Sequence, residues 1–494
     1  MINHEIFREY DIRGIAERDL TSPVIEALGR AFASYLRPKG ISAVTVGYDA
    51  RLSSERLCGD IVRGLTSQGV NVTILGLCPT PVVYFSLFQL KPGAGVMITG
   101  SHNPAEFNGF KLCVGKETIY GEEIQKLRRI MEEAEGKAHS SSLIANDMLS
   151  HDPGTKSHEL SATSCGSMTH RPILPDYISH LKGLFTGNRE VPLRIVLDSG
   201  NGTAGLVAPE IIKAMGCEVI ELYSEPDGRF PNHHPDPTIP KNLAALIETV
   251  RTKKADAGIA FDGDADRIGV VDEQGNVLWG DQLMVLFSRD ILKNHAGATF
   301  VSEVKCSQTM YDDIRANGGN AIMWKTGHSL IKAKMKESSA AMAGEMSGHL
   351  FFADRYFGYD DAVYAACRLV EILKKRKSEQ GAGATLSSLL ADLPRTYNTP
   401  EIRFDCPDAI KFEVVAKARE IFSRGQDLPE RPKEVITVDG VRAVFDNGWG
   451  LIRASNTQPV LVMRFEAKDT GSLDAIRTMM EQKVNEIISG MNAS

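Results

Sequence analysis

Residues 259–271 read Ile-Ala-Phe-Asp-Gly-Asp-Ala-Asp-Arg-Ile-Gly-Val-Val. The apolar runs at both ends have the composition of buried strands, and the segment between them holds three aspartates at every second position. Two other strand-like runs also lead directly into polar loops: Ala94–Thr99 before residues 100–104, and Ala341–Gly344 before residues 345–349. Ligand sites of α/β sheets lie beyond the carboxyl ends of strands. The three loops therefore predict three similar α/β sections around one central cleft.

The rest of the chain extends this pattern. Apolar runs alternate with amphipathic helical stretches, which is typical of βαβ units. Strands are expected at Ile41–Val46, Val70–Leu75, Leu193–Leu197, Glu218–Leu222, Phe300–Val304 and Ala321–Trp324, and helices at Ser53–Gln68 and Ala204–Met215. The alternation weakens after about Leu390. We therefore expect α/β domains with mixed sheets over residues 1–172, 173–277 and 278–390, and a smaller C-terminal α+β domain over 391–494.

The stretch 136–171 is rich in serine and histidine. The spacing of its histidines fits no compact coordination pattern, so a flexible insertion at the edge of the first domain is favoured over a metal-binding tract. This stretch contains none of the three polar loops.

Composition excludes several classes of function. The chain has 56 Lys and Arg against 63 Asp and Glu, a net charge of −7, so it lacks an overall positive field for nucleic acid or an anionic membrane. Nowhere do 18 apolar residues run together, and the N-terminus lacks the pattern of a signal peptide. The eight cysteines form no Cys-x-x-Cys pair. We expect a cytoplasmic protein, monomeric or weakly homo-oligomeric, that binds neither nucleic acid nor membranes.

The aspartate loop has the chemistry of a cation site. Asp262, Asp264 and Asp266 offer three hard oxygen ligands and a charge of −3, which suits Mg²⁺. A solvated acidic turn is the alternative, but the strand-like flanks favour the metal site. An EF-hand is excluded because Arg267 stands at the sixth position, where that loop requires glycine. Arg267 suits a phosphate oxygen bound near the metal instead.

Ser101 is expected on a tight turn with His102 beside it. By itself Ser-His-Asn-Pro is a good turn sequence without chemistry. A phosphorylated serine would carry about −1.5 to −2 of charge and three oxygens, one of which could complete a magnesium site beside the aspartates. The serine loop and the aspartate loop are therefore interpreted together.

Other polar groups could hold a phosphorylated ligand. Glu345 and Ser347 match sugar hydroxyls, and His349 could donate or accept a proton near neutral pH. The segment Arg453-Ala454-Ser455-Asn456-Thr457 could surround a phosphate or form a plain turn. Three more basic residues lie close to strand ends, although each alone is more often an ordinary surface residue: Lys111, Lys305 and His328.

Taken together, the ordered motifs resemble the α-D-phosphohexomutase superfamily, and most closely its bacterial phosphomannomutase/phosphoglucomutase branch. The resemblance extends from Phe7-Arg8-Glu9-Tyr10-Asp11-Ile12-Arg13-Gly14 to Thr457, and its most specific motifs are Thr-Gly-Ser-His-Asn-Pro and Asp-Gly-Asp-Ala-Asp-Arg. It implies a phosphoserine at Ser101, which with the three aspartates would bind magnesium. It also implies positive charge from Arg13 and Arg267 near the transferred group. The remaining implied substrate contacts are Tyr10, Lys305, His328, Glu345, Ser347, Arg453, Ser455, Asn456 and Thr457.

The reaction that the resemblance implies is reversible phosphoryl transfer between C1 and C6 of hexose phosphates. It would interconvert mannose 1-phosphate and mannose 6-phosphate, and the glucose phosphates as well, through a hexose 1,6-bisphosphate. Mg²⁺ would be the cofactor and glucose 1,6-bisphosphate the activator. The fourth domain would close over the sugar to exclude water. His349, Lys111 and His102 are the candidates for the general base.

Three other functions remain open at this point. A glucosamine-phosphate mutase is the main alternative, although a glutamine in place of Met346 would resemble that group more closely. A magnesium-dependent sugar phosphatase could use the same serine and aspartates. A sugar-phosphate sensor without catalysis would need the phosphate-binding segment but neither metal nor nucleophile.

Overall fold

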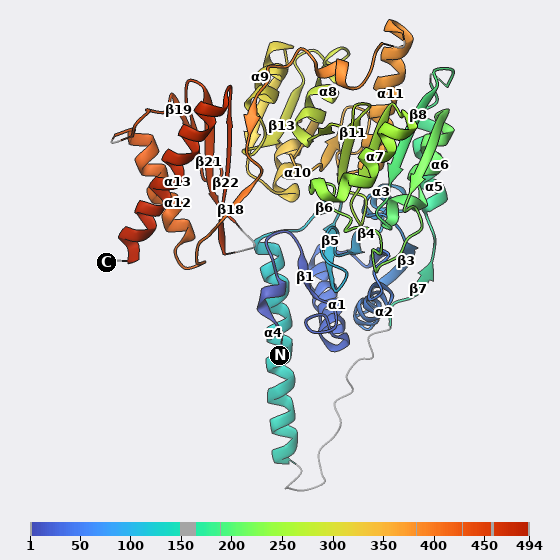
Figure 1. Ribbon diagram of the computed structural model, residues 1–494. Helices are drawn as coiled ribbons and strands as arrows, with labels where there is room; N and C mark the ends of the chain where they lie inside the picture. The colour runs from blue at the N-terminus through green and yellow to red at the C-terminus, as the bar shows by residue number, and fades with distance from the viewer. Residues whose placement is uncertain are drawn as a thin grey trace. The chain divides into compact units, whose positions relative to one another are not determined.

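The structure is a computed structural model that describes residues 2–148, 165–187, 189–381, 383–426, 428–455 and 459–492 (Figure 1). It forms two compact units. Unit 1 comprises Met1–Leu278 and Tyr359–Leu386, and unit 2 comprises Trp279–Gly358 and Ser387–Ser494. Asn456 and Thr457 lie outside the described residues, as does 149–164 of the stretch predicted to be flexible. At the ends of that stretch, helix α4 (Glu122–Met148) continues to Met148 and strand β7 spans Met168–His170.

The first sheet of unit 1 is mixed. Its strand order is β1-β5-β4-β2-β3-β7, with β6 paired to β5, and β2 is parallel to both β3 and β4 whereas β5 is antiparallel to β4. Helices α1 (Ser22–Leu36), α2 (Ser54–Thr66) and α4 share one apolar core with this sheet, and α3 (Thr80–Gln89) contacts β2 and β4. The strands are β1 (Ile12–Ile15), β2 (Ala43–Tyr48), β3 (Asn71–Leu77), β4 (Gly93–Ile98), β5 (Phe107–Val114) and β6 (Glu117–Thr118).

Two glycines allow α1 and α2 to pack closely. A Cβ atom on Gly64 would lie 2.3 Å from the carbonyl oxygen of Glu26 and 2.8 Å from the Cα atom of Gly29. Any larger side chain would push the helices apart. This contact sets the position of α2, which begins shortly after the carboxyl end of β2.

The second sheet of unit 1 has the order β12-β11-β10-β8-β9. Strand β8 is parallel to β9 and β10, and β11 is antiparallel to β10. The strands are β8 (Leu193–Asp198), β9 (Cys217–Leu222), β10 (Ala257–Phe261), β11 (Ile268–Asp272) and β12 (Val277–Leu278), and the helices are α5 (Leu174–Leu184), α6 (Ala208–Ala214) and α7 (Ala244–Lys253).

One helix prediction for this section is wrong. The continuous helix predicted over Ala204–Met215 is a 3₁₀ turn, η3 (Thr203–Leu206), followed by α6. The backbone leaves the helical region at Val207, where φ is −134°. Pro209, which has no amide hydrogen to donate, stands in the first turn of α6 and therefore marks a new helix start.

Helix α11 (Ala362–Gln380) belongs to unit 1 although it follows the strands of unit 2 in the sequence. The hydroxyl of Tyr177 donates to the buried carboxylate of Asp361 at 2.9 Å, just before the helix. Lys374 donates to the carbonyl oxygen of Val191 at 2.6 Å. The segment predicted as domain 278–390 is thus divided between the two units, and the domain limits themselves stay a prediction.

The third sheet lies in unit 2 and has the order β14-β13-β15-β16. Strand β13 is parallel to β14 and β15, and β16 is antiparallel to β15. The elements are β13 (Thr299–Glu303), β14 (Asn320–Trp324), β15 (Met342–Gly344), β16 (Leu350–Phe352), α8 (Gly280–Leu292), α9 (Gln308–Ala316) and α10 (His328–Glu337).

The three sheets share one topology. In each, a central strand has two parallel neighbours, and the second of these leads into an antiparallel strand: β4 into β5, β10 into β11, and β15 into β16. The three polar loops singled out in the sequence are these connections. The prediction of three related α/β sections with mixed sheets is therefore confirmed.

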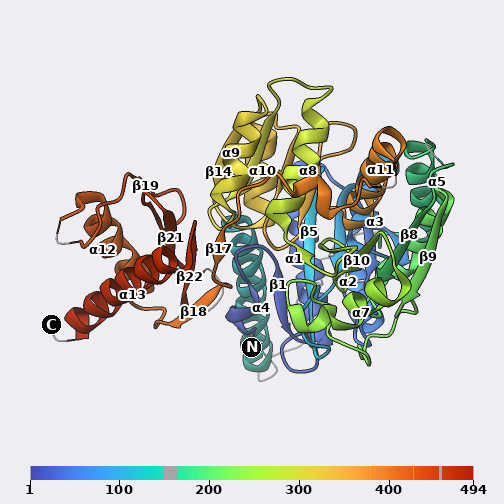
Figure 2. The same cartoon turned by 45° about the horizontal axis from the view of Figure 1, so that its top comes forward.

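The C-terminal section is an antiparallel α+β unit, as predicted. Its strand order is β17-β22-β21-β20-β19, with β18 on β22, and helices α12 (Lys411–Arg424) and α13 (Thr470–Asn492) cover one face of the sheet (Figure 2). All eight residues of β22 are buried. The strands are β17 (Tyr397–Asn398), β18 (Ile402–Asp405), β19 (Glu434–Ile436), β20 (Val441–Val444), β21 (Gly448–Ala454) and β22 (Val460–Ala467).

Arg442 on β20 joins two parts of unit 2. Its guanidinium donates to the carbonyl oxygens of Val304 at 2.6 Å and Cys306 at 2.7 Å, and its Cζ atom lies 3.7 Å from the ring centroid of Trp449. The side chain is completely buried. Its removal would leave two carbonyl groups without their donor in a dry environment.

We therefore expect Arg442→Met to destabilise unit 2 by about 2–4 kcal/mol, since each unsatisfied buried polar group costs about 1–3 kcal/mol. All three tryptophans of the chain, Trp279, Trp324 and Trp449, belong to unit 2. Urea unfolding followed by tryptophan fluorescence thus reports this unit selectively. Arg403→Met on β18, where the side chain is 60% exposed, is the control. Equal midpoints for the two variants would contradict the expected role of Arg442.

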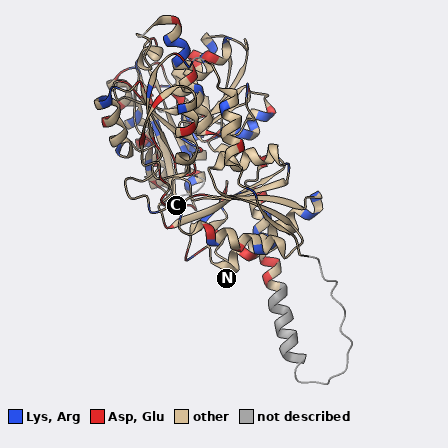
Figure 3. Cartoon of the chain, turned by 90° about the vertical axis from the view of Figure 1, so that its right-hand side faces the viewer, with Lys and Arg blue, Asp and Glu red and all other residues tan. Residues whose placement is uncertain are grey.

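Charges of both signs are interspersed over the helices in the view of Figure 3. This agrees with the small net charge of the sequence. Within the described ranges, no helix combines the length and the hydropathy needed to cross a membrane.

Candidate active site

The loop between β4 and β5 holds Ser101 in an unusual conformation. Its φ angle is +49°, in the left-handed region that side chains rarely adopt. The Oγ atom donates to Oδ2 of Asp262 at 2.7 Å and lies 3.1 Å from Nδ1 of His102. Ser101 is buried and His102 is half-buried. Two loops that are 161 residues apart in the sequence therefore meet at this hydroxyl.

The loop between β10 and β11 gathers its three aspartates by a turn. The Oδ1 atom of Asp262 accepts the amide hydrogens of Asp266 and Arg267, both at 3.1 Å, and Ala265 is left-handed with a φ of +59°. Carboxylate oxygens of Asp262, Asp264 and Asp266 all lie within 4.8 Å of one another. The carboxylates of the three aspartates thus lie close together, as predicted, because the loop makes a turn.

Lys111 on β5 partly neutralises this loop. Its ammonium donates to Oδ2 of Asp264 at 2.7 Å and also to Oδ2 of Asp266. Burial alone would lower the pKa of Lys111, but the charges of Asp264 and Asp266 outweigh burial and raise that pKa above its ordinary value. Burial and then the neighbouring aspartates raise the pKa of Asp262 well above its ordinary range.

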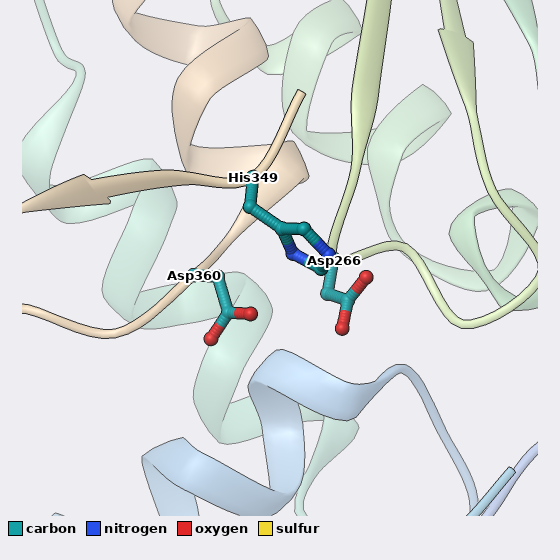
Figure 4. A group of neighbouring side chains, drawn as sticks. All are labelled: Asp266, His349 and Asp360. Atoms are coloured by element: carbon teal, nitrogen blue, oxygen red, sulfur yellow. The ribbon is translucent and has the colours of Figure 1, made fainter. Parts of the chain in front are cut away.

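Asp360 adds a fourth carboxylate to this part of unit 1. It lies just before α11 and is fully buried, and one of its carboxylate oxygens is within 4.8 Å of one from Asp266 (Figure 4). Four buried carboxyl groups thus lie in this part of unit 1, and Lys111 pairs with two of them. Such a site can accept a cation.

The aspartate loop fits a divalent cation. Oδ1 of Asp264 is buried and accepts no hydrogen bond from any described residue, so it is available as a ligand. Three hard oxygen donors are the usual protein ligands of Mg²⁺. Asp262, Asp264 and Asp266 would hold the ion.

Three other predicted residues belong to unit 1, and one of them, Arg13, contacts the serine loop. Nη1 of Arg13 donates to Oδ1 of Asn103 at 2.9 Å, and its Nη2 pairs with Asp11. This places the guanidinium beside the loop. Arg267 directly follows the three aspartates, and Tyr10 lies just before β1; both are half-buried.

Unit 2 groups four of the predicted residues around the β15–β16 loop. Oε1 of Glu345 accepts the amide hydrogen of Gly327 at 2.7 Å, and its Oε2 atom accepts from the hydroxyl of Ser347 at 3.2 Å. The rings of His328 and His349 are stacked with centroids 5.4 Å apart. The start of α10 and the β15–β16 loop thus bring His328, Glu345, Ser347 and His349 together.

Two basic residues of unit 2 are held by acids in the same region. Lys305 lies 3.3 Å from Oε2 of Glu401, and Nε of Arg453 donates to Oδ2 of Asp439 at 3.0 Å. The same Asp439 oxygen accepts the amide hydrogen of Thr326 at 3.0 Å, which links Arg453 to the start of α10. Ser455, at the end of β21, is buried.

Some residues of the site belong to none of the motifs singled out in the sequence. Asp49 and Arg51 follow the carboxyl end of β2, the position that marks the other loops, and this signal could have revealed them. Thr80 binds Asp264 through both its amide (2.9 Å, to the carbonyl oxygen) and its hydroxyl (2.5 Å, to Oδ2). No pattern in the sequence identifies Thr80. Asp360 is half of an acidic pair before a helical run, which by itself resembles an ordinary helix cap.

Four family models match consecutive parts of the chain. Those of phosphoglucomutase/phosphomannomutase alpha/beta/alpha domains I, II and III match residues 4–138, 175–275 and 279–397. The model of the phosphoglucomutase/phosphomannomutase C-terminal domain matches residues 401–483. The matches follow the order of the four sheets.

Individual proteins resemble the chain over nearly its whole length. A phosphomannomutase/phosphoglucomutase of Pseudomonas aeruginosa is 40% identical, covering 98% of this chain and 96% of that protein. A phosphoglucomutase of Neisseria gonorrhoeae is 41% identical, covering 96% of each. The crystal structure of a phosphoglucomutase/phosphomannomutase family protein from Burkholderia thailandensis superimposes with a TM-score of 0.86 at 37% identity, covering 99% of both chains. The chain belongs to the phosphoglucomutase/phosphomannomutase family of the α-D-phosphohexomutase superfamily.

Proposed function

We propose that the protein is a hexose-phosphate mutase that transfers a phosphoryl group reversibly between C1 and C6 of a hexose phosphate. The observation that carries this proposal is the hydrogen bond between the Ser101 hydroxyl and Asp262 at 2.7 Å, which joins a nucleophile to a cation-binding loop. Relatives named phosphomannomutase/phosphoglucomutase support it. Serine in such surroundings can carry the phosphoryl group between two positions of one sugar.

The first half-reaction starts from phosphorylated Ser101. The bond between Oγ and phosphorus breaks as a bond forms from phosphorus to the free hydroxyl oxygen of the sugar, and the released Oγ atom takes up a proton to become the serine hydroxyl. The hydroxyl proton passes to a general base, for which His102 and His349 stay the candidates. Lys111, the third predicted candidate, is an ammonium that donates to Asp264 and Asp266 and therefore has no lone pair to accept a proton. Magnesium, when bound by the three aspartates, would neutralise charge on the transferred group. Arg13 and Arg267 supply further positive charge near Ser101.

The second half-reaction consumes the hexose 1,6-bisphosphate formed in the first. The bisphosphate turns over, and its other phosphoryl group passes to Oγ of Ser101, which gives up its proton. The sugar oxygen released from phosphorus takes up a proton and becomes a hydroxyl. Loss of the bisphosphate midway would leave an unphosphorylated enzyme, which is why we propose glucose 1,6-bisphosphate as the activator. Water must be excluded during transfer, and closure of the C-terminal section over the sugar stays our prediction.

Unit 2 supplies the proposed sugar and phosphate contacts. The carboxylate of Glu345 and the hydroxyl of Ser347 can bind sugar hydroxyls. The phosphate that is not transferred would be bound by basic and polar side chains that accept two different orientations of the sugar. We assign this role to Lys305, His328, Arg453, Ser455, Asn456 and Thr457, together with Tyr10 of unit 1.

Mannose and glucose phosphates are the proposed substrates. The experiment compares kcat/KM for mannose, glucose and glucosamine 1-phosphates, with Mg²⁺ and glucose 1,6-bisphosphate present. We expect both neutral sugars to be converted faster than the amino sugar. A clear preference for glucosamine 1-phosphate would reject this assignment. Steady release of inorganic phosphate without isomer formation would favour the phosphatase, and binding without any conversion would favour the sensor.

Magnesium binding should be measurable as a gain in protein stability. Addition of Mg²⁺ should stabilise the wild-type protein by about 2–3 kcal/mol at roughly 100 times the dissociation constant, since a ligand of the native state stabilises by mass action. Asp264→Asn removes one ligand charge and should lose most of this gain. Calorimetric unfolding in Mg²⁺ and in EDTA measures both. The control is Asp256→Asn, in the residue before β10 and away from the loop; an equal magnesium response in the two variants would exclude Asp264 as a ligand.

The cellular setting follows from the sequence alone. We propose a cytoplasmic location and a monomeric or weakly associating state. Size-exclusion chromatography with light scattering tests the second of these, and a stable higher oligomer would contradict it.

A further inference from the structure

Arg51, three residues beyond the end of β2, is completely buried in unit 1. Its Nη2 atom donates to the carbonyl oxygens of Ser101 at 2.8 Å and Asn103 at 2.6 Å. Its Nη1 atom donates to the carbonyl oxygens of Phe107 at 2.9 Å and Pro104. One guanidinium thus binds four carbonyl groups of the loop that carries the nucleophile.

Asp49 holds the same loop from its other end. Its Oδ2 atom accepts hydrogen bonds from Nε of Arg51 at 3.1 Å, the hydroxyl of Thr99 at 2.8 Å and the amide of Gly100 at 3.2 Å. The hydroxyl of Thr99 in turn accepts the amide hydrogen of Ser101 at 2.7 Å. The buried charge of Arg51 is therefore paired, and the backbone on both sides of Ser101 is fixed.

The space around the guanidinium is filled. A Cβ atom on Gly100 would lie 2.5 Å from Cζ of Arg51, so that position has room for glycine alone. On another side, the ring centroid of Phe230 lies 5.2 Å from Cζ. Gly228 packs on the chain here, since a Cβ atom on it would lie 2.3 Å from the carbonyl oxygen of Ala50. Residues 228–230, from the section of the second sheet, thus enclose Arg51.

This arrangement explains how Ser101 keeps its conformation. A left-handed backbone costs a residue with a side chain about 1–2 kcal/mol, and it persists where the surroundings fix it. Arg51 and Asp49 provide six hydrogen bonds to the loop. The orientation of the Ser101 hydroxyl toward Asp262 depends on that conformation.

We propose that Arg51 is a positioning residue for phosphoryl transfer, and that its guanidinium, enclosed by Asp49 and Phe230, keeps the Ser101 hydroxyl aligned with Asp262. This inference rests on the proposed function. Lysine cannot replace Arg51, because an ammonium group is a point donor whereas the planar guanidinium reaches several acceptors in one plane. The charge would be kept and the alignment lost.

The experiment compares Arg51→Lys with Arg56→Lys. Arg56 also donates to backbone carbonyls, those of Leu20 at 3.1 Å and Ala16 at 3.2 Å, but it does not contact the serine loop. In Arg51→Lys we expect kcat to fall about 10–100-fold with KM changed less than about threefold, since small misplacements of reacting groups cost rates of this order. Amide hydrogen exchange of residues 99–107 should become faster. Arg56→Lys should keep kcat and the amide exchange of residues 99–107 near their wild-type values.

A second variant covers the case in which Arg51→Lys does not fold. Phe230→Leu removes the ring from a half-buried position and should lower kcat by a few-fold with faster exchange of 99–107. Exchange needs no turnover, so it tests the role of Arg51 even if the wild-type protein lacked mutase activity, a result that would reject the proposed function alone. The inference would be overturned if the amide exchange and kcat of Arg51→Lys and Phe230→Leu equalled those of Arg56→Lys. It would also be overturned if these variants changed KM alone.

Discussion

Ser101→Ala is expected to reduce mutase turnover by at least about 10⁴-fold, because removal of a covalent nucleophile leaves binding and electrostatic contributions alone. The variant should also lose the phosphoryl group that intact mass spectrometry is expected to find on the wild-type protein after treatment with glucose 1,6-bisphosphate. The fold should survive, because Arg51 and Asp49 hold the loop through groups other than the Ser101 side chain.

Ser199→Ala is the matched control for this experiment. Ser199 is also buried in unit 1 and follows the end of β8, as Ser101 follows β4. It contributes to none of the contacts of the proposed site. Residual turnover in Ser101→Ala comparable to that of Ser199→Ala, or a phosphoryl group that remains on Ser101→Ala, would exclude the phosphoserine mechanism.

The sequence predicts the three polar loops because each combines two strong signals. A buried strand ends, and residues with a defined chemistry follow at once within five or six positions. Ser101, Asp262 and Glu345 all stand at such strand ends, and the structure places each on the same connection of its sheet. Loop chemistry of this kind is local, so the order of residues along the chain is sufficient to detect it.

Other features depend on contacts that sequence patterns do not contain. Arg51 binds carbonyl groups 50 to 56 residues away, and every residue type offers a carbonyl. The pattern of α11 predicts a helix, but it does not tell which sheet the helix covers. The pairing of Lys111 with Asp264 and Asp266 depends on two sheets within unit 1. Each of these is a tertiary contact without a periodic or local signature.

The second large effect is expected from Lys111→Met. In the wild-type protein the Lys111 ammonium lies between Asp264 and Asp266, and all three side chains are buried. Methionine keeps the volume but leaves the carboxylates without their nearest cation. Breaking a buried charge pair costs about 3–5 kcal/mol. Unit 1 should lose stability by this amount in EDTA, measured by calorimetry and by amide exchange of residues 93–114.

Adding Mg²⁺ distinguishes the electrostatic role of Lys111, which neutralises the aspartates, from any other role of this side chain. Because a bound divalent cation would neutralise the same carboxylates, Mg²⁺ should restore most of the stability that Lys111→Met loses. Lys374→Met is the control, since Lys374 is also buried in unit 1 but donates to the carbonyl oxygens of Val191 and Gly216. Its loss should be smaller and independent of magnesium. If both variants lost the same stability and neither responded to Mg²⁺, Lys111 would not be the counter-charge of the aspartate loop. Turnover of Lys111→Met at saturating Mg²⁺ then measures what the lysine contributes to the reaction, apart from its contribution to folding.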